Sequence, residues 1–188
     1  MTYRTKTYIA ADFDNDADAV EQLRKWNNSD YWGLSFHDAH ELTQARDSSL
    51  PCSIKDSLRE RLSASKTFVL IVGEKTNNIT KGGCQLCASY NSWSKSCARG
   101  HSVDYRSYIK YECEMAQKNY YDPFVSNYHI IVLYESTNID RTKCPEVLRN
   151  IGIHTNMIYK GDDGRYYWDY KSVKRAFDSI FKTIQTKK

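Results

Sequence analysis

An α/β fold with a mainly parallel sheet is predicted by the alternation of two kinds of segment along the chain. Short apolar runs that suit buried strands alternate five times with segments whose apolar residues recur at helical spacing. The strongest strand signal, at residues 67–72, is apolar throughout, as expected for a strand covered on both faces. With 188 residues the chain fits one domain that carries a large insertion.

The chain begins with a strand, a helix and a second strand. The first strand is expected at residues 7–11 and ends in an acidic turn. The helix expected at residues 17–27 has an apolar stripe formed by Ala19, Val20, Leu23 and Trp26. The second strand is expected from Trp32 to Phe36, ending at His37 and Asp38, and a polar loop at residues 39–51 follows it.

A second helix precedes the central strand. Ser53 is expected to cap this helix, with Asp56 in a capping-box position. Its apolar stripe consists of Ile54, Leu58 and Leu62. After the strand at residues 67–72, residues 75–105 are rich in Asn, Gly, Ser and Cys. A loop of this length inside a domain is usually functional or separately stabilised, so we treat it as a Cys-rich insertion.

The remaining chain is expected to hold a helix at residues 106–118, a strand at 129–134, a strand at 153–159 and a last helix from about Tyr170. The last helix has an inward-facing stripe formed by Val173, Phe177, Ile180, Phe181 and Ile184. These elements complete a layered fold in which ligands bind outside the carboxyl ends of the strands.

Glu112 stands out in the helix at residues 106–118. On a helical wheel it falls within the apolar arc, between Tyr108 and Ala116. A carboxylate in such a place is costly to ionise unless it is paired. It is either a hydrogen-bonded glutamate at the edge of a core or a catalytic acid with a raised pKa.

Composition limits the classes of partner. The net charge of +4 is spread and interleaved with acids, which disfavours a nucleic-acid binder. No window approaches the ~18 apolar residues of a membrane span, and the N-terminus lacks the apolar core of a signal peptide. We therefore expect a cytoplasmic protein whose cysteines are thiols or metal ligands rather than disulfides.

Several common chemistries are disfavoured. Neither GxxxxGK[ST] nor GxGxxG occurs, so the usual nucleotide-binding loops are absent from the sequence. The acids after the first strand resemble a receiver's Mg²⁺ site, but the central strand ends in Gly73 and Glu74 rather than in an aspartate. His37 or His40 could activate a nucleophile, but no GxSxG elbow occurs.

The insertion contains a candidate zinc site. Cys84, Cys87, Cys97 and His101 form a C-x2-C-x9-C-x3-H pattern, which suits tetrahedral zinc. With four protein ligands the metal would be structural. The alternative is a group of unrelated thiols in a variable insertion.

Glycosidic chemistry is the candidate for Glu112. Cleavage of an N-glycosidic bond passes through an oxocarbenium-like state that a carboxylate can stabilise or attack. The helix begins at the carboxyl end of the central strand, so we expect Glu112 at the ligand edge of the sheet. Tyr108, one turn earlier on the same helix face, could line one side of the pocket. Asp38 could approach the pocket from the loop after the second strand.

The sequence resembles the TIR-like domains, in particular the Thoeris anti-phage defence TIR proteins of the ThsB kind. The resemblance covers about residues 6–136 and rests on four segments, namely YIAAD at 8–12, FHD at 36–38, FVLIVG at 68–73 and YIKYE at 108–112. The last is similar to the family's aromatic-x-x-x-Glu motif. The resemblance as a whole implies a flavodoxin-like TIR fold with a five-stranded, mainly parallel sheet and helices on both faces. This fold would form a single domain spanning residues 1–188.

The resemblance also implies a function. Glu112 would be the catalytic glutamate for NAD⁺ cleavage, Asp12 and Phe13 would contact the substrate, and His37 and Asp38 would begin the loop that covers the pocket. The product would be a cyclic ADP-ribose-type signal that activates a partner effector. Self-association through TIR surfaces and a phage-derived trigger are further expectations, whereas a membrane partner is not expected.

Two features depart from the family pattern. Tyr108 stands where the family commonly has tryptophan, and the insertion is longer than usual. Two alternatives therefore stay open. One is a non-enzymatic TIR module that acts by self-association or partner binding, and the other is an enzyme of similar fold that cleaves nucleosides.

Overall fold

The computed structural model describes residues 5–34, 36–39 and 50–185. Its centre is a five-stranded sheet in the order β2-β1-β3-β6-β7, in which all neighbouring strands are parallel. The strands are β1 (Thr5–Ala10), β2 (Phe36–Asp38), β3 (Thr67–Val72), β6 (His129–Tyr134) and β7 (Ile153–Asn156). The predicted α/β, flavodoxin-like fold is confirmed.

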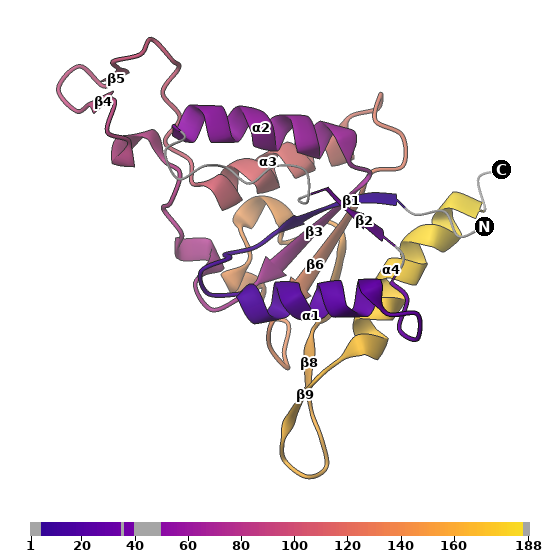
Figure 1. Ribbon diagram of the computed structural model, residues 1–188. Coiled ribbons are helices and arrows are strands. Elements are labelled where there is room, and N and C mark those ends of the chain that lie inside the picture. Colours follow the sequence, from indigo (N-terminus) through magenta and orange to yellow (C-terminus); the bar gives the residue numbers. More distant parts are fainter. Residues whose placement is uncertain (1–4, 35, 40–49, 186–188) are drawn as a thin grey trace.

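Helices cover both faces of the sheet (Figure 1). The four α-helices are α1 (Ala17–Asn28), α2 (Pro51–Ala64), α3 (Tyr108–Tyr121) and α4 (Tyr170–Gln185). Residues of α2 and α3 share one core cluster with Tyr8 and Phe68, whereas residues of α1 and α4 share another with Ile9 and Val69. Neighbouring strand residues thus face opposite layers. None of the helices in the described ranges is long and apolar enough to span a membrane.

The central strand β3 owes its position to its composition. All six residues, TFVLIV, are buried, and β3 pairs along its whole length with β6. Burying each large aliphatic side chain contributes roughly 1.5–3 kcal/mol relative to exposure. The predicted apolar stripe of α1 is also confirmed, since Ala19, Val20, Leu23 and Trp26 are all buried.

Three predicted boundaries are wrong. The second strand ends at Asp38, as expected, but begins at Phe36 rather than at Trp32, because Gly33 (φ +54°) lies in a turn and Trp32 packs against Tyr170 instead. Helix α2 begins at Pro51, whose fixed φ suits the first helical position, so Ser53 lies inside the helix and is not its cap.

The run at residues 153–159 is divided between two sheets. Strand β7 ends at Asn156, and the buried Met157 separates it from β8 (Ile158–Lys160). β8 pairs antiparallel with β9 (Tyr166–Trp168) in a separate hairpin. The side chains of Phe181 and Ile184, and residues 40–49 including His40, lie outside the described part of the chain.

The insertion between β3 and α3 extends away from the sheet as a loop (Figure 1). It contains the short 3-10 helices Thr76–Asn78 and Cys84–Leu86 and a small antiparallel hairpin, β4 (Tyr90–Asn91) with β5 (Ser96–Cys97). The amide of Tyr108 donates to the carbonyl of Lys81 at 2.9 Å. The loop between them therefore leaves and re-enters the body of the protein at one place.

A buried lysine fastens the end of the insertion to α2. The ammonium of Lys55, whose side chain is 4% exposed, donates to the carbonyls of Asp104 (3.1 Å) and Arg106 (2.7 Å) and pairs with the Asp104 carboxylate (3.4 Å). The guanidinium of Arg106 forms ion pairs of 2.7 Å with Asp104 and with Glu114, which lies on α3. Burial would raise the pKa of Asp104, but the hydrogen bonds of Arg106 and the charge of Lys55 lower it to about 2.

Replacing Lys55 by methionine should destabilise the protein. Lys55→Met keeps the apolar stem but removes the ammonium donor from the carbonyl of Arg106 and from the carbonyl and carboxylate of Asp104. The Asp104 carbonyl still accepts a hydrogen bond from the amide of Cys84, so we expect a cost of about 2 kcal/mol. The measurement is the free energy of unfolding in urea. The control is Lys110→Met, since Lys110 is exposed on α3 and its loss should cost less than about 0.5 kcal/mol. Equal losses in the two variants would contradict the role assigned to Lys55.

Candidate catalytic site

Glu112 is buried between helix α3 and the sheet. Its residue exposure is 5%, and the hydroxyl of Tyr8, on β1, donates a hydrogen bond to its Oε1. The ring of Tyr8 is held in turn by stacking on Phe68 of β3, with the ring centroids 6.0 Å apart. The carboxyl group therefore has a fixed polar partner inside an otherwise apolar layer.

The surroundings of Glu112 change its ionisation. Burial raises its pKa to about 7, while the hydrogen bond from Tyr8 and the charge of Arg61 act in the opposite direction. The pKa of the Tyr8 hydroxyl is also raised, first by burial and then by the nearby charge of Glu112. A carboxyl group with a pKa near neutrality can exchange its proton at physiological pH.

The structure places Glu112 deeper than the expected ligand edge. Helix α3 begins near that edge, where the hydroxyl of Ser107 accepts from the amide of Lys110 at 3.2 Å and caps the helix. The helix then runs back along the sheet, descending about 1.5 Å per residue. One turn from the start, Glu112 has therefore reached Tyr8, in the middle of β1.

Tyr108 lies beside the insertion. It is half-buried, and a Cβ atom added at Gly82 would lie 2.5 Å from its ring, so only glycine fits against it there. Its pKa is raised by burial and then by the neighbouring thiols of Cys87, Cys84 and Cys52. Tyr108 thus links the start of α3 to the cysteines of the insertion.

Asp12 and Phe13 lie in the turn that follows β1. The carboxylate of Asp12 accepts from the side-chain amide of Asn15 at 2.5 Å and from the amide of Asp14 at 3.2 Å, which orders the turn. Phe13 is 41% exposed. An ion pair of 2.8 Å between Asp14 and Lys81 joins this turn to the base of the insertion. The turn is thus at the carboxyl edge of the sheet, as expected.

Asp38 and Glu112 lie on opposite faces of the sheet. The carboxylate of Asp38 pairs with Arg24 of α1 at 3.0 Å, and its side chain is 5% exposed. This is the α1 side, whereas Glu112 and Tyr8 lie on the α2 and α3 side. His37, the preceding residue, is exposed. The structure does not bring Asp38 to Glu112.

A second buried carboxyl group, Asp16, lies at the carboxyl edge; in the sequence it was considered only as one of the acids of a receiver-like Mg²⁺ site. Burial raises its pKa to about 6. A Cβ atom added at Gly73 would lie 2.0 Å from its Oδ1, so the glycine that ends β3 makes room for this carboxyl group. Glu135, after β6, has its pKa raised by burial and then by Asp16 and Asp18. In the sequence, Gly73 directly after the buried strand β3 was the feature that could have indicated a side chain packed closely at this point.

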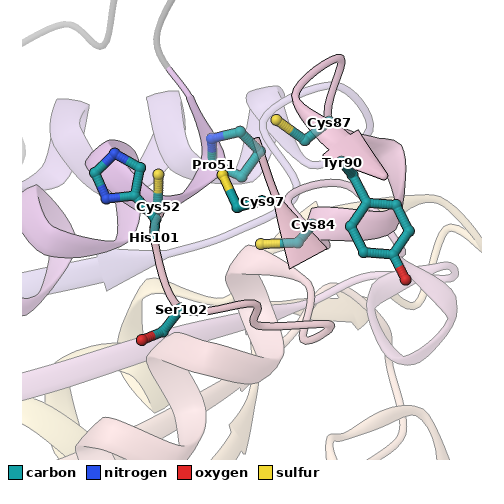
Figure 2. A pocket seen from close by; sticks show the side chains of 8 residues that line it. All are labelled: Pro51, Cys52, Cys84, Cys87, Tyr90, Cys97, His101 and Ser102. Atoms are coloured by element: carbon teal, nitrogen blue, oxygen red, sulfur yellow. The ribbon is translucent and has the colours of Figure 1, made fainter. Parts of the chain in front are cut away.

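The four candidate zinc ligands lie around one pocket (Figure 2). Cys84, Cys87, Cys97 and His101 line it, together with Cys52 from the start of α2. As the side chains lie, no three His, Cys, Asp or Glu residues of the described ranges are grouped as metal ligands. This pocket is separate from Glu112, which does not line it.

Comparison with known protein families gives a match over part of the chain. Residues 8–81 match the family model described as Thoeris protein ThsB, TIR-like domain. The matched segment includes Asp12, Phe13, His37 and Asp38, whereas Tyr108 and Glu112 follow it. No curated protein matches the chain.

Glu112→Gln should stabilise the protein in a pH-dependent way. The folded-state pKa is raised from 4.5 to about 7, so between these values the unfolded state ionises first and stability falls as pH rises. The neutral amide of the glutamine avoids this loss of stability and can still accept the hydrogen bond from the Tyr8 hydroxyl. We expect a gain of about 3 kcal/mol at about pH 8 that vanishes near pH 4.5.

Urea unfolding across this pH range measures the gain. The exposed Glu60 of α2 supplies the control, because Glu60→Gln should give no such pH-dependent difference. A stability difference between Glu112→Gln and wild type that does not vary with pH would show that Glu112 ionises normally.

Proposed function

Because residues 8–81 match the model of the ThsB TIR-like domain, we propose that the protein cleaves the N-glycosidic bond of NAD⁺, with Glu112 as the catalytic carboxylate. A Thoeris TIR-like domain implies involvement in anti-phage defence. The product in this proposal is a cyclic ADP-ribose-type molecule that carries the signal to an effector.

The observation that carries the proposal is the carboxyl group of Glu112. It lies in the YIKYE segment and accepts a hydrogen bond from Tyr8, and burial raises its pKa to about 7 against the lowering effect of Tyr8 and Arg61. An ionised carboxylate in a dry site stabilises a nearby positive charge far more strongly than one in water. Such a group suits an oxocarbenium-like transition state.

The chemistry can be written in two steps. The bond between the ribose C1′ atom and the nicotinamide nitrogen breaks, and its electron pair neutralises the pyridinium ring, which leaves as nicotinamide. The carboxylate of Glu112 stabilises or captures the positive ribose carbon. A nucleophilic atom of the same ADP-ribose unit then attacks C1′ and releases a proton, which closes the ring.

The proposal requires that NAD⁺ can reach the buried carboxylate of Glu112. Glu112 is 5% exposed, so NAD⁺ can reach it only if the layer formed by α2, α3 and β1 opens around the Tyr8–Glu112 pair. Tyr8 is then a positioning residue that orients the carboxylate. Asp12 and Phe13, in the turn after β1, are proposed to contact the part of the substrate that lies at the edge of the sheet.

One observation favours a second candidate function, a non-enzymatic module that acts by self-association or partner binding. Trp93 on the insertion and Phe124 after α3 are 93% and 94% exposed. Exposed aromatic side chains are common anchors of protein interfaces. Incubation of concentrated protein with NAD⁺ separates the two candidates, because only an enzyme releases nicotinamide. Comparing NAD⁺ with nucleosides as substrates tests the third alternative.

Glu112→Gln should abolish the cleavage of NAD⁺ while keeping the fold. The amide preserves shape but cannot stabilise a positive charge as a carboxylate does, so we expect a loss of at least ~100-fold in nicotinamide release. Nicotinamide and the nucleotide product are followed by chromatography, both with purified protein and in extracts of phage-infected cells that express each variant.

Glu114→Gln, on the same helix, is the matched control. Glu114 pairs with Arg106 and is 30% exposed, so its replacement should leave the rate within about two-fold. Nicotinamide release by Glu112→Gln at the wild-type rate, under conditions in which wild type is active, would remove the catalytic assignment.

Tyr8→Phe should move the pH profile rather than abolish activity. If Glu112 acts as a carboxylate, kcat/KM rises with pH through the pKa of about 7. The Tyr8 hydroxyl lowers this pKa, so its removal should shift the midpoint to higher pH, while the ring still stacks on Phe68. Tyr128→Phe, a buried tyrosine of the same layer, should not shift the profile. An unchanged midpoint in Tyr8→Phe would contradict the positioning role.

A further inference from the structure

Four of the six cysteines of the chain line a single pocket. Cys84, Cys87 and Cys97 come from the insertion, and Cys52 comes from the start of α2 (Figure 2). The other two, Cys113 and Cys144, are fully buried in the core, where a small apolar side chain is expected. Ordinary burial therefore accounts for those two but not for the group in the pocket.

The backbone around Cys84 and Cys87 forms a tight turn. The amide of Cys87 donates to the carbonyl of Cys84 at 2.9 Å, and the amide of Leu86 donates to Gly83 at 3.0 Å. The amide of Asp104 also donates to the Sγ atom of Cys84 at 3.2 Å. A backbone N–H group directed at sulfur stabilises the thiolate form and is the kind of outer contact that supports a metal ligand.

The second half of the pattern is placed by the hairpin. Cys97 lies on β5 and pairs with Tyr90 of β4, whose amide donates to the carbonyl of Cys87 at 3.0 Å. The amide of Gly100 donates to the carbonyl of Cys97 at 2.9 Å, and this turn returns His101 to the pocket. Two short turns joined by a hairpin thus bring all four side chains to one place.

The insertion lacks an apolar core that would order it. Its hairpin pairs only two residues with two, and isolated hairpins of this kind are marginally stable in water. Most residues from Tyr90 to Arg99 are exposed or half-exposed. The fastening by Lys55 and Arg106 acts on its last residues alone. The hairpin is otherwise held by the contact between the hydroxyls of Tyr90 and Tyr105 at 3.1 Å, so a cross-link near the cysteines would add to its order.

We propose that this pocket binds one Zn²⁺ ion through the thiolates of Cys84, Cys87 and Cys97 and an imidazole nitrogen of His101. Each thiol gives up one proton to solvent when the ion binds, and the four protein ligands complete a tetrahedral, structural site. The present side-chain arrangement does not group them as ligands. Rotation of the side chains, with the backbone kept, must close the site when the ion binds, as is usual where binding and ordering are coupled.

The pocket fits an ion better than an organic ligand. Its enclosed free volume is about 10 Å³, room for about one water-sized group and far below the ~300–1,000 Å³ of sites that hold small molecules. The site also lies next to Tyr108, against whose ring Gly82 packs. Bound zinc would thus fix the insertion against the first residue of α3, one turn before Glu112.

The test is the metal content of the full chain. Protein purified without chelators should contain about one zinc per chain. Cys84→Ser, Cys87→Ser, Cys97→Ser and His101→Ala should each lower the content at least ~10-fold, whereas His101→Cys, which supplies another zinc ligand, should retain it. Cys113→Ala, His37→Ala and Cys52→Ser are the controls and should leave the zinc content unchanged.

Cobalt gives a second measurement that does not depend on loading in the cell. Addition of Co²⁺ to metal-free wild type should produce the thiolate charge-transfer and tetrahedral d–d absorption bands, and Cys97→Ser should weaken them. Zinc below about a tenth of one equivalent together with no cobalt bands would overturn the proposal. So would a disulfide among the three thiols in freshly purified protein. Loss of zinc in Cys52→Ser but not in His101→Ala would refute the assigned ligand set.

Discussion

The hydrogen bond between Tyr8 and Glu112 constrains how helix α3 lies on the sheet. A carboxyl group buried in an apolar layer must keep a partner, and Tyr8 offers one at a single place in the middle of β1. Because a helix turns 100° per residue, any slip of α3 along its own sequence would separate the pair. The bond therefore selects one register for the helix, which apolar packing alone would leave less defined.

The two faces of the sheet achieve their packing differently. The face covered by α1 and α4 is joined mainly by apolar side chains such as Leu23 and Phe177, with one ion pair between Asp38 and Arg24 at the edge strand. The face covered by α2 and α3 contains two buried polar junctions, one at Glu112 and one at Lys55. Polar junctions are directional, so these two fix how α2 and α3 lie in their layer. It is also the layer to which the insertion is attached, through Asp104 and Arg106.

The features that could be predicted from the sequence are those that depend on a local pattern of residues. Periodicity located β3 and the buried stripe of α1, and the placement of Glu112 on an apolar helix face led to its recognition. Partners far along the chain left no such pattern: nothing near Tyr8 points to Glu112, 104 residues away. The start of α2 was misplaced because the capping pattern at Ser53 competed with Pro51, and Pro51 prevailed. Asp38 was assigned to the wrong neighbourhood because the face of a short edge strand depends on its register with β1.

The bond between the Tyr108 amide and the Lys81 carbonyl, 2.9 Å long, has a consequence for how such a protein can diversify. The chain between these residues is a loop whose two ends are hydrogen-bonded to each other, so the ends stay together whatever the length of the loop. Doubling the length of a flexible loop costs only about 0.6 kcal/mol in closure entropy. Residues can thus be gained or lost in the outer part of this stretch, before the contacts of Asp104 and Arg106 with Lys55, without moving α3 or the sheet. This stretch of chain is free to acquire new contacts over evolutionary time while the Tyr8–Glu112 pair stays in place.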